Sequence, residues 1–238
     1  MRLGVNIDHI ATLRQVRGAT TVYPDLMYFV KESVRAKAEQ ITIHLREDRR
    51  HIQLDDLKIL SQRCPVDLNL EMAVNSEMLG LALKYKPEWC CFVPESREEL
   101  TTEGGLNVLK FESKIKTYVH KLAAQKIKTS MFIEPDVQQV RSSAEVGAKA
   151  VEFHTGKWVL LKGKQKKSEW ERLKKSALLA HQLGLRVHAG HGLDTDHVKL
   201  IKKLPFLVEV NIGHFIICDS LKEGLFESVK RLKNILKK

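Results

Sequence analysis

Residues 41–46 read Ile-Thr-Ile-His-Leu-Arg, and this alternation of apolar and polar side chains decides the fold. Three stretches repeat it: Leu-Asn-Leu-Glu at 68–71, Val-Glu-Phe-His at 151–154 and Val-Glu-Val-Asn-Ile-Gly at 208–213. Side chains alternate between two faces along a strand, so each stretch has one apolar face and one polar face. An antiparallel sheet could turn the polar face to water. Because helical segments separate these strands, the polar faces must instead point into a shared interior.

Strand and helix patterns alternate along the whole chain. The patterns predict strands at 3–8, 41–46, 66–71, 89–93, 128–133, 150–154, 186–189 and 208–212. Helical patterns follow at about 24–38, 55–62, 75–85, 107–124, 136–146, 168–183, 194–203 and 219–236, with expected N-caps at Asp55, Asn75, Asp136, Ser168, Asp194 and Asp219. Eight βα units without a linker favour a closed barrel over an open sheet. We therefore expect residues 1–238 to form a single α/β domain, a (β/α)8 TIM barrel.

Composition restricts the classes of partner. The net charge of +11 raises the question of nucleic acid. However, residues 162–175 carry seven Lys/Arg and two Glu, and residues 222–238 carry six Lys/Arg and two Glu, on helical patterns whose charged faces are solvated. These segments do not interleave aromatic side chains as a stacking platform for bases would. We expect no nucleic-acid partner, although a basic surface attracts anionic substrates.

The same reading bears on location. No apolar run is long enough to span a bilayer, and a strand pattern from residue 3 leaves no room for a signal peptide. The four cysteines (Cys64, Cys90, Cys91 and Cys218) form no CxxC pair. We therefore expect a cytoplasmic protein with reduced cysteines and no membrane partner.

The predicted barrel has polar residues where its strands end, which is the end where barrel enzymes have their active sites. Glu71 lies inside a strand, where burial would raise its pKa toward the range of a general base. His44 and His191 are suited to proton transfer near neutral pH, and Glu152 to stabilising a cationic intermediate. The alternative is a buried ion network of Glu71 with His44 or Arg46. The role of His154, just before Thr155-Gly156, stays open between function and a structural turn.

Two anion sites are indicated. Gly190-His191-Gly192 and Ile212-Gly213-His214 end the last two strands, whose loops form the usual phosphate site of such barrels. The alternative is that these glycines only make tight turns. A second group of cations follows the first two strands: Arg14, Arg17, Arg46, Arg49, Arg50 and His51. Its alternative is a solvated loop, in which Glu47 and Asp48 pair with the arginines.

Some chemistries are disfavoured. No lysine has the inward parity near a strand end, since Lys157 falls in a loop, so a Schiff base with the enzyme is not expected. A metal site from Asp8, His44, Glu71 and His191 would lack a His-x-His pair, and we expect neither a metal nor another cofactor. The polar loop from Pro94 to Leu106 could close over a substrate on a Gly104-Gly105 hinge, or it could be a surface excursion.

A resemblance to a known family rests on long blocks of sequence. These are Val5-Asn-Ile-Asp-His-Ile-Ala-Thr-Leu-Arg14, Arg17-Gly18, Ile43-His-Leu-Arg-Glu-Asp-Arg-Arg-His-Ile52, Asn69-Leu-Glu-Met-Ala-Val74, Val93-Pro-Glu95, Thr101-Thr-Glu-Gly-Gly105, His154-Thr-Gly156, Ala189-Gly-His-Gly-Leu193 and Asn211-Ile-Gly-His214. From residue 3 to about 220 the chain resembles the pyridoxine 5′-phosphate synthase family. The resemblance implies a (β/α)8 barrel in a homo-octamer. It also implies condensation of 3-amino-2-oxopropyl phosphate with 1-deoxy-D-xylulose 5-phosphate to give pyridoxine 5′-phosphate, phosphate and water.

The resemblance also implies roles for individual residues. His44 corresponds to the proton acceptor, Glu71 to a second acid–base group, His191 to the proton donor and Glu152 to the transition-state stabiliser. The aminoketone-phosphate site would comprise Asn6, Arg17, Gly192, Gly213 and His214. The deoxyxylulose-phosphate site would comprise Asp8, His9, Arg46, His51 and Thr101. In that reaction the imine joins the two substrates, which agrees with the missing lysine.

Two departures from the family pattern stand out. His188 takes the place of an Asn before Ala-Gly-His-Gly, and the loop at 157–167 is unusually basic and apolar. Two other functions remain as alternatives: a metal-dependent barrel hydrolase or aldolase, and a basic RNA-binding protein.

Overall fold

Eight parallel strands close into a barrel in sequence order, β1 to β8. The structure is a computed structural model that describes the whole chain except residues 19, 96–103 and 238. The strands are β1 (Arg2–Asn6), β2 (Gln40–His44), β3 (Asp67–Met72), β4 (Trp89–Phe92), β5 (Lys128–Ile133), β6 (Ala150–His154), β7 (Arg186–Gly190) and β8 (Leu207–Ile212). All eight predicted strands and the predicted (β/α)8 barrel are confirmed.

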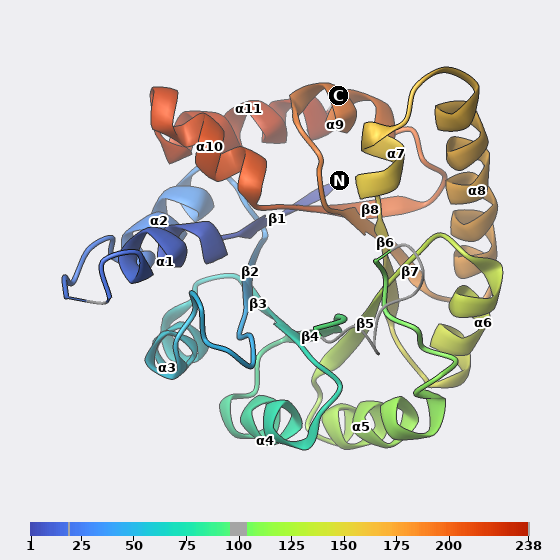
Figure 1. The fold of residues 1–238 in the computed structure, drawn as a ribbon, viewed down its shortest axis with the longest axis horizontal. Helices are drawn as coiled ribbons and strands as arrows, with labels where there is room; N and C mark the ends of the chain where they lie inside the picture. Colours follow the sequence, from blue (N-terminus) through green and yellow to red (C-terminus); the bar gives the residue numbers. More distant parts are fainter. Residues whose placement is uncertain (19, 96–103, 238) are drawn as a thin grey trace.

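Helices surround the barrel, as Figure 1 shows. They are α1 (Asp8–Gln15), α2 (Leu26–Arg35), α3 (Leu54–Arg63), α4 (Ser76–Tyr85), α5 (Glu112–Ala124), α6 (Val137–Glu145), α7 (Gly156–Leu160), α8 (Gly163–Gln182), α9 (Thr195–Ile201), α10 (His214–Glu223) and α11 (Leu225–Lys237). The sequence reading missed α1 and α7, which follow strands directly. The predicted helix at 219–236 is wrong as a single element, because Gly224 with φ +84° separates α10 from α11.

Three of the six expected N-caps are confirmed. Asn75, Asp136 and Asp194 accept hydrogen bonds from first-turn amides of α4, α6 and α9. The other three are wrong because their helices begin earlier: α3 is capped by Gln53, α8 begins at Gly163 and α10 begins at His214, so Asp55, Ser168 and Asp219 lie inside helices.

The strand parity works as the alternation predicts. Parallel pairing sets Ile43 beside Leu70 and His44 beside Glu71, so apolar neighbours face the helices while polar neighbours face the axis. Ile43 and Leu70 are fully buried. The barrel interior is therefore polar along part of its length, where the interiors of such barrels are usually filled by branched aliphatic side chains.

A hydrogen-bonded network occupies the barrel interior toward the amino-terminal ends of β1 and β2. Glu209 of β8 accepts from Arg2 Nε at 2.7 Å and from Gln40 Nε2 at 3.0 Å. Gln40 also donates to Asn211 Oδ1 at 3.2 Å. His188 joins this network, with Nδ1 3.3 Å from Glu209 Oε1, and burial lowers the pKa of His188 to about 4. Its other ring nitrogen, Nε2, is buried without a hydrogen-bond partner among the described residues, so the contact with Glu209 satisfies only one side of the His188 ring.

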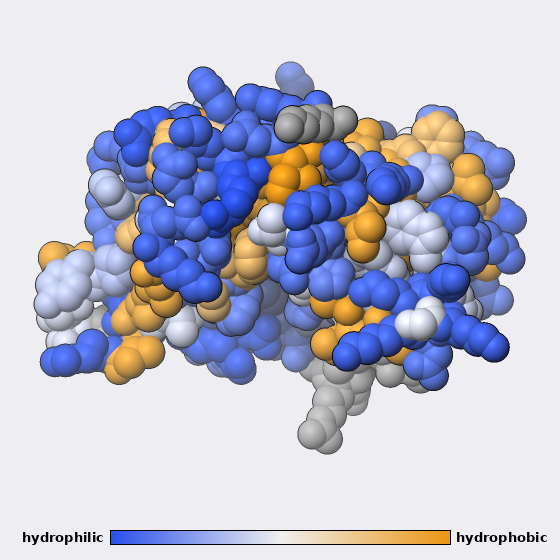
Figure 2. Space-filling view, turned by 90° about the horizontal axis from the view of Figure 1, so that it is seen from above, coloured by the Kyte–Doolittle hydropathy of each residue, from blue (hydrophilic) through white to orange (hydrophobic). Residues whose placement is uncertain are grey.

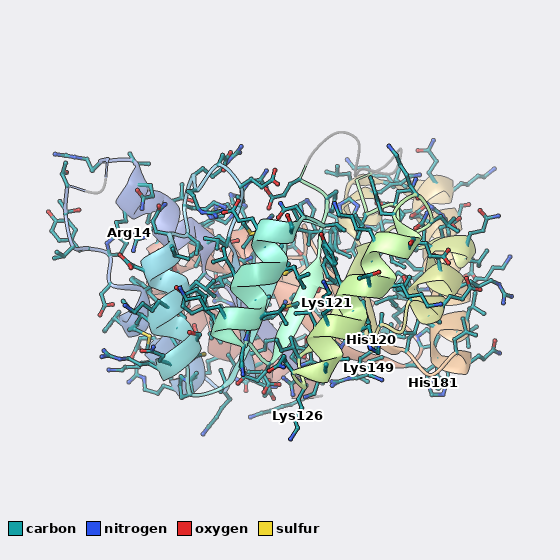
Figure 3. The ribbon with its side chains drawn as sticks, turned by 90° about the horizontal axis from the view of Figure 1, so that it is seen from below. Arg14, His120, Lys121, Lys126, Lys149 and His181 are labelled. Atoms are coloured by element: carbon teal, nitrogen blue, oxygen red, sulfur yellow. The ribbon has the colours of Figure 1, made fainter. Side chains whose placement is uncertain are left out.

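The exterior is mostly hydrophilic with scattered apolar patches, as Figure 2 shows. Lys126 and Lys149, labelled in Figure 3 with His181, lie exposed just before β5 and β6, so part of the positive charge is at the amino-terminal end of the barrel. Among the helices in the described residues, none combines the length and apolar character needed to cross a bilayer.

Candidate active site

The carboxyl ends of β1 and β2 are tied together by Asp8. Its Oδ1 accepts from the backbone N–H of His44 at 2.8 Å, and its Oδ2 accepts from Asn6 Nδ2 at 2.9 Å. Asp8 begins α1 and is buried. Burial raises the pKa of Asp8 to about 6, against the opposing charge of His44. Asp8 is therefore a carboxyl group that exchanges its proton near neutral pH.

His44 lies between two carboxyl groups. Its Nε2 is 2.6 Å from Glu95 Oε1, and its Nδ1 is 3.8 Å from Glu71 Oε2. Burial acts to raise the pKa of Glu95, but the hydrogen bond with His44 helps to hold it below its ordinary value. An ionised Glu95 accepts a hydrogen bond from Nε2–H, so the other ring nitrogen, Nδ1, lies on the side of Glu71. This arrangement fixes the orientation of the His44 ring.

Glu71 is placed on β3 to exchange a proton with this site. Its side chain is 18% exposed. Burial raises its pKa well above the ordinary value, and the negative charges of Asp8 and Glu152 raise it further. The 3.8 Å separation from His44 is longer than a hydrogen bond. Glu71 is therefore a carboxyl group that burial makes a weaker acid, and it lies beside the His44 ring.

Glu152 lies deeper in the barrel. Its Oε2 accepts from Asn211 Nδ2 at 2.7 Å, and a Cβ built at Gly190 would lie 2.2 Å from its Oε1. Burial raises the pKa of Glu152 to about 8, and the charge of Glu209 contributes. With a pKa of about 8 the buried carboxyl favours its protonated form near neutral pH, and a cation bound beside it would favour the ionised form.

His191 follows β7 with a left-handed backbone, φ +76°. Its ring meets that of His154 edge to face, with centroids 4.7 Å apart. Burial lowers the pKa of His191, and the His154 ring lowers it further. The hydroxyl of Thr155 donates to the carbonyl oxygens of Gly190 and His191, both at 2.7 Å, and so pins the turn.

The predicted aminoketone-phosphate residues are only partly brought together. Gly213 precedes α10 without a side-chain cap, leaving first-turn amides available to an anion. A Cβ at Gly213 would lie 2.9 Å from Asn6 Cβ, so these residues are in close contact. His214 is exposed beside His9, with ring centroids 5.0 Å apart. Arg17 is exposed in the loop after α1, which projects to the edge of the molecule in Figure 1.

Gly192, the fifth residue of that set, follows His191 with φ +77°, and its α-carbon region packs against Gly156 and Val159. A left-handed backbone is least strained in glycine, which also leaves the amides open to a ligand. These glycines can therefore make tight turns and also leave room for a phosphate group.

Of the cations predicted to form the second anion site, only some lie near His44. His51 is buried, 6.3 Å from His44 between ring centroids, and its pKa falls to about 4 through burial and then the charges of His44, Arg46 and His9. This mutual repulsion marks a region that favours an anion. Arg46 lies beyond the end of β2, 3.8 Å from Asp48. Thr101 falls outside the described residues, as does most of the predicted hinged loop.

Three arginines of that group are engaged elsewhere. Arg14 makes a bidentate pair with Asp56 at 2.8 and 2.6 Å, and Figure 3 shows it on the side of the barrel. Arg49 pairs with Glu77 at 2.6 Å, and Arg50 with Asp48 at 2.5 Å. The alternative of pairing with Asp48 is thus confirmed for Arg50, whereas Arg14 and Arg49 pair with carboxylates of α3 and α4, and the anion site on these arginines stays a prediction. In the described part of the chain, no group of three His, Cys, Asp or Glu side chains is arranged to hold a metal ion.

Two features were missed by sequence reasoning. Glu95 was quoted only within Val93-Pro-Glu95 and given no role, although a carboxylate just after β4 has the position of a site residue. Lys157 was placed in a loop, but it lies in α7, where its Nζ is 3.9 Å from Glu169.

The family model described as "Pyridoxal phosphate biosynthesis protein PdxJ" matches residues 3–238. The chain belongs to the PdxJ family. It is 63% identical over 237 residues to the pyridoxine 5′-phosphate synthase of Bdellovibrio bacteriovorus, covering 100% of this chain and 98% of that protein. It is 47% identical to the enzyme of the same name from Thioalkalivibrio sulfidiphilus, covering 98% of this chain and 94% of that one.

Solved structures extend the likeness of fold. The 3-hexulose-6-phosphate synthase of Salmonella typhimurium superposes with a TM-score of 0.67 at 13% identity, covering 100% of this chain and 99% of that one. Phosphoribosylanthranilate isomerase from Thermotoga maritima gives a TM-score of 0.61 at 10% identity, with 100% and 98% covered. At these identities the PdxJ chain shares the barrel fold with them.

Proposed function

We propose that the carboxyl end of this barrel carries out pyridoxine 5′-phosphate synthesis with His44, Glu71, Glu152 and His191 as its acid–base groups. The PdxJ chain is an enzyme of vitamin B6 biosynthesis, which condenses 3-amino-2-oxopropyl phosphate with 1-deoxy-D-xylulose 5-phosphate. The observation that carries the assignment of roles is His44 held between Glu95 and Glu71.

Proton transfer is the main demand of the reaction, because imine formation, loss of water and ring closure each move protons. In this proposal His44 accepts a proton at Nδ1. Glu71, whose pKa is raised by burial, exchanges protons with the same region. His191 donates a proton from the opposite side of the barrel mouth, and its lowered pKa makes that proton easier to release.

Glu152 meets the positive charge of the imine in this proposal. Its pKa of about 8 means that the carboxyl loses its proton as a cation arrives. Asn211 holds the carboxyl group in place through Oε2. In this proposal the negative charge of Glu152 forms when the imine cation lies beside it.

Two phosphate groups would fix the reacting carbon chains in this site. We assign the aminoketone phosphate to Asn6, Gly192, Gly213 and His214, with Arg17, and the deoxyxylulose phosphate to Asp8, His9, Arg46 and His51, with Thr101. Close contact between Asn6 and Gly213 supports the first grouping, and the charges of Arg46 and His9, which lower the pKa of His51, support the second. Holding both substrates converts a bimolecular condensation into a nearly unimolecular one.

We further propose that residues 1–238 act as one domain in a cytoplasmic homo-oligomer, an octamer by family resemblance. The loop between α1 and α2 leaves Val16, Val22 and Tyr23 exposed at 74%, 91% and 69%. Exposed apolar side chains on one loop favour contact with another subunit. The four cysteines are free, which suits a reducing compartment. Small phosphorylated compounds are its proposed partners, without nucleic acid or membrane.

The roles are tested by comparing Glu71→Gln and His191→Asn with the unaltered protein, in turnover and in thermal stabilisation by each substrate alone. Turnover falling by about a hundredfold or more, with stabilisation by both substrates retained, supports the assignment. Full turnover in either variant would remove the role of that residue. Loss of stabilisation by one substrate would make the residue a binding group instead.

A further inference from the structure

A second carboxylate–imidazole pair lies beside His191, on the ends of β5 and β6. Glu134 Oε1 and His154 Nδ1 are 2.5 Å apart. Glu134 is 3% exposed and the His154 side chain is 12% exposed. A buried carboxylate accepts at this distance from an Nδ1–H, so the pair fixes both the tautomer and the plane of the His154 ring.

The His154 ring is fitted closely against His191. The two rings meet edge to face at 4.7 Å with an interplanar angle of 63°. Phe132 of β5 forms a shared wall, with its ring centroid 5.4 Å from His154 and 6.4 Å from His191. The titratable groups that face His191 are therefore His154 from β6 and, through it, Glu134 from the end of β5.

Two glycines make room for this contact. A Cβ built at Gly156 would lie 2.7 Å from His154 Nε2 and 2.9 Å from His191 Cδ2. A Cβ at Gly104 would lie 3.3 Å from His154 Cε1. A Cβ at position 156 would thus clash with both imidazoles, and one at position 104 would press on the His154 ring, so the two glycines leave the space that the rings occupy.

A purely structural role explains Glu134 poorly. Its second oxygen, Oε2, is buried without a hydrogen-bond partner among the residues that the structure describes. Burying a carboxylate with one oxygen unsatisfied is costly, and such groups in native proteins usually have a use. A neutral side chain would fill the same space with less penalty.

We propose that Glu134 and His154 are positioning residues for His191, Glu134 fixing the ring of His154 and that ring fixing the imidazole of His191 within the site. The inference rests on the proposed role of His191 only where it concerns turnover. His154 also adds to burial in lowering the pKa of His191. The pair therefore controls both the direction and the acidity of the imidazole that faces the substrates.

The first test is an NMR titration of the His191 imidazole in the substrate-free protein, with the signal assigned through His191→Asn. His154→Phe keeps a ring against His191 but removes its charge. We expect the pKa of His191 to rise by about half a pH unit or more in this variant. We also expect a low-field Nδ1 proton on His154 in the unaltered protein that Glu134→Ala abolishes. An unchanged His191 pKa, or a persisting Nδ1 proton, would overturn the proposal.

The second test is steady-state kinetics with both substrates. Glu134→Ala should lower kcat about tenfold or more with KM within about twofold, and Glu134→Gln, which keeps an acceptor oxygen, should recover part of the loss. Glu145→Ala, at the exposed end of α6, is the matched control and should behave as the unaltered protein. Equal kinetics for the Ala variants of Glu134 and Glu145 would refute the positioning role. If His191→Asn keeps full turnover, the proposed donor role fails, while the titration still decides whether the pair controls His191.

Discussion

Replacing Glu152 by Gln should stabilise the PdxJ chain increasingly as the pH rises. Folding raises the pKa of this carboxyl from 4.5 to about 8. Between those two values the folded state keeps a proton that the unfolded state loses, so the unaltered protein loses stability as the pH rises. Glutamine has the same shape, retains an oxygen for Asn211 Nδ2 and does not titrate. The difference in the free energy of unfolding between the two proteins should therefore depend on pH.

The size of the effect follows from the same two pKa values. Each pH unit within the interval contributes about 1.4 kcal/mol, so the full interval corresponds to about 5 kcal/mol. Between about pH 5 and pH 8 the unfolding free energy of Glu152→Gln, relative to the unaltered protein, should rise by about 3 kcal/mol. Below pH 4.5 the difference should be constant, because both states of the unaltered protein are then protonated.

Urea unfolding at a series of pH values, followed by circular dichroism, measures this difference. Glu145→Gln, an exposed glutamate, serves as the control and should give no pH-dependent difference. A difference between Glu152→Gln and the unaltered protein that is independent of pH would refute the reasoning, because it would mean that Glu152 is ionised in the folded protein at neutral pH.

Three further predictions concern the two halves of the site. Glu71→Gln should lower kcat by about a hundredfold or more while KM for both substrates changes only a few-fold, as steady-state kinetics will show; equal kcat would contradict its role. Gly213→Ala should raise KM for the aminoketone phosphate about tenfold, because the new Cβ meets Asn6 at 2.9 Å, whereas Gly80→Ala, with open space around it, should not. Inorganic phosphate should raise the pKa of His51 from about 4 in an NMR titration and should bind more tightly as the pH falls; an unchanged His51 would place the phosphate elsewhere.

The strands were predictable because their cause is local. In a parallel barrel the apolar face of each strand contacts helices along its length. The alternation from Ile41 to Arg46 is therefore visible in consecutive residues of the sequence. The end of that strand was not predictable: β2 stops at His44, and Arg46 belongs to the following turn. Likewise, the Asp8 carboxylate at the start of α1 is held by Asn6, two residues before it, and by the His44 amide of β2, and the second of these contacts cannot be seen in the local sequence.

The candidate site was predictable where it lies on strands and less so where it depends on loops. His44 and Glu71 follow from parity, since their strands pair in register. Glu95 and Glu134 follow their strands outside the alternation, so only the folded chain shows that each meets a histidine. The partner of Arg14 was unpredictable for a related reason: its pairing with Asp56 depends on the position of α3 against α1, which the spacing of charges does not determine.

The central claim is that this barrel end joins two phosphorylated substrates by acid–base chemistry. The most direct measurement is incubation of the purified chain with 3-amino-2-oxopropyl phosphate and 1-deoxy-D-xylulose 5-phosphate, with mass-spectrometric detection of product and parallel assay of inorganic phosphate. The account predicts pyridoxine 5′-phosphate and inorganic phosphate in equal amounts, and neither when Glu71→Gln replaces the unaltered protein over the same period. No product from the unaltered chain, with both substrates shown to bind, would contradict it.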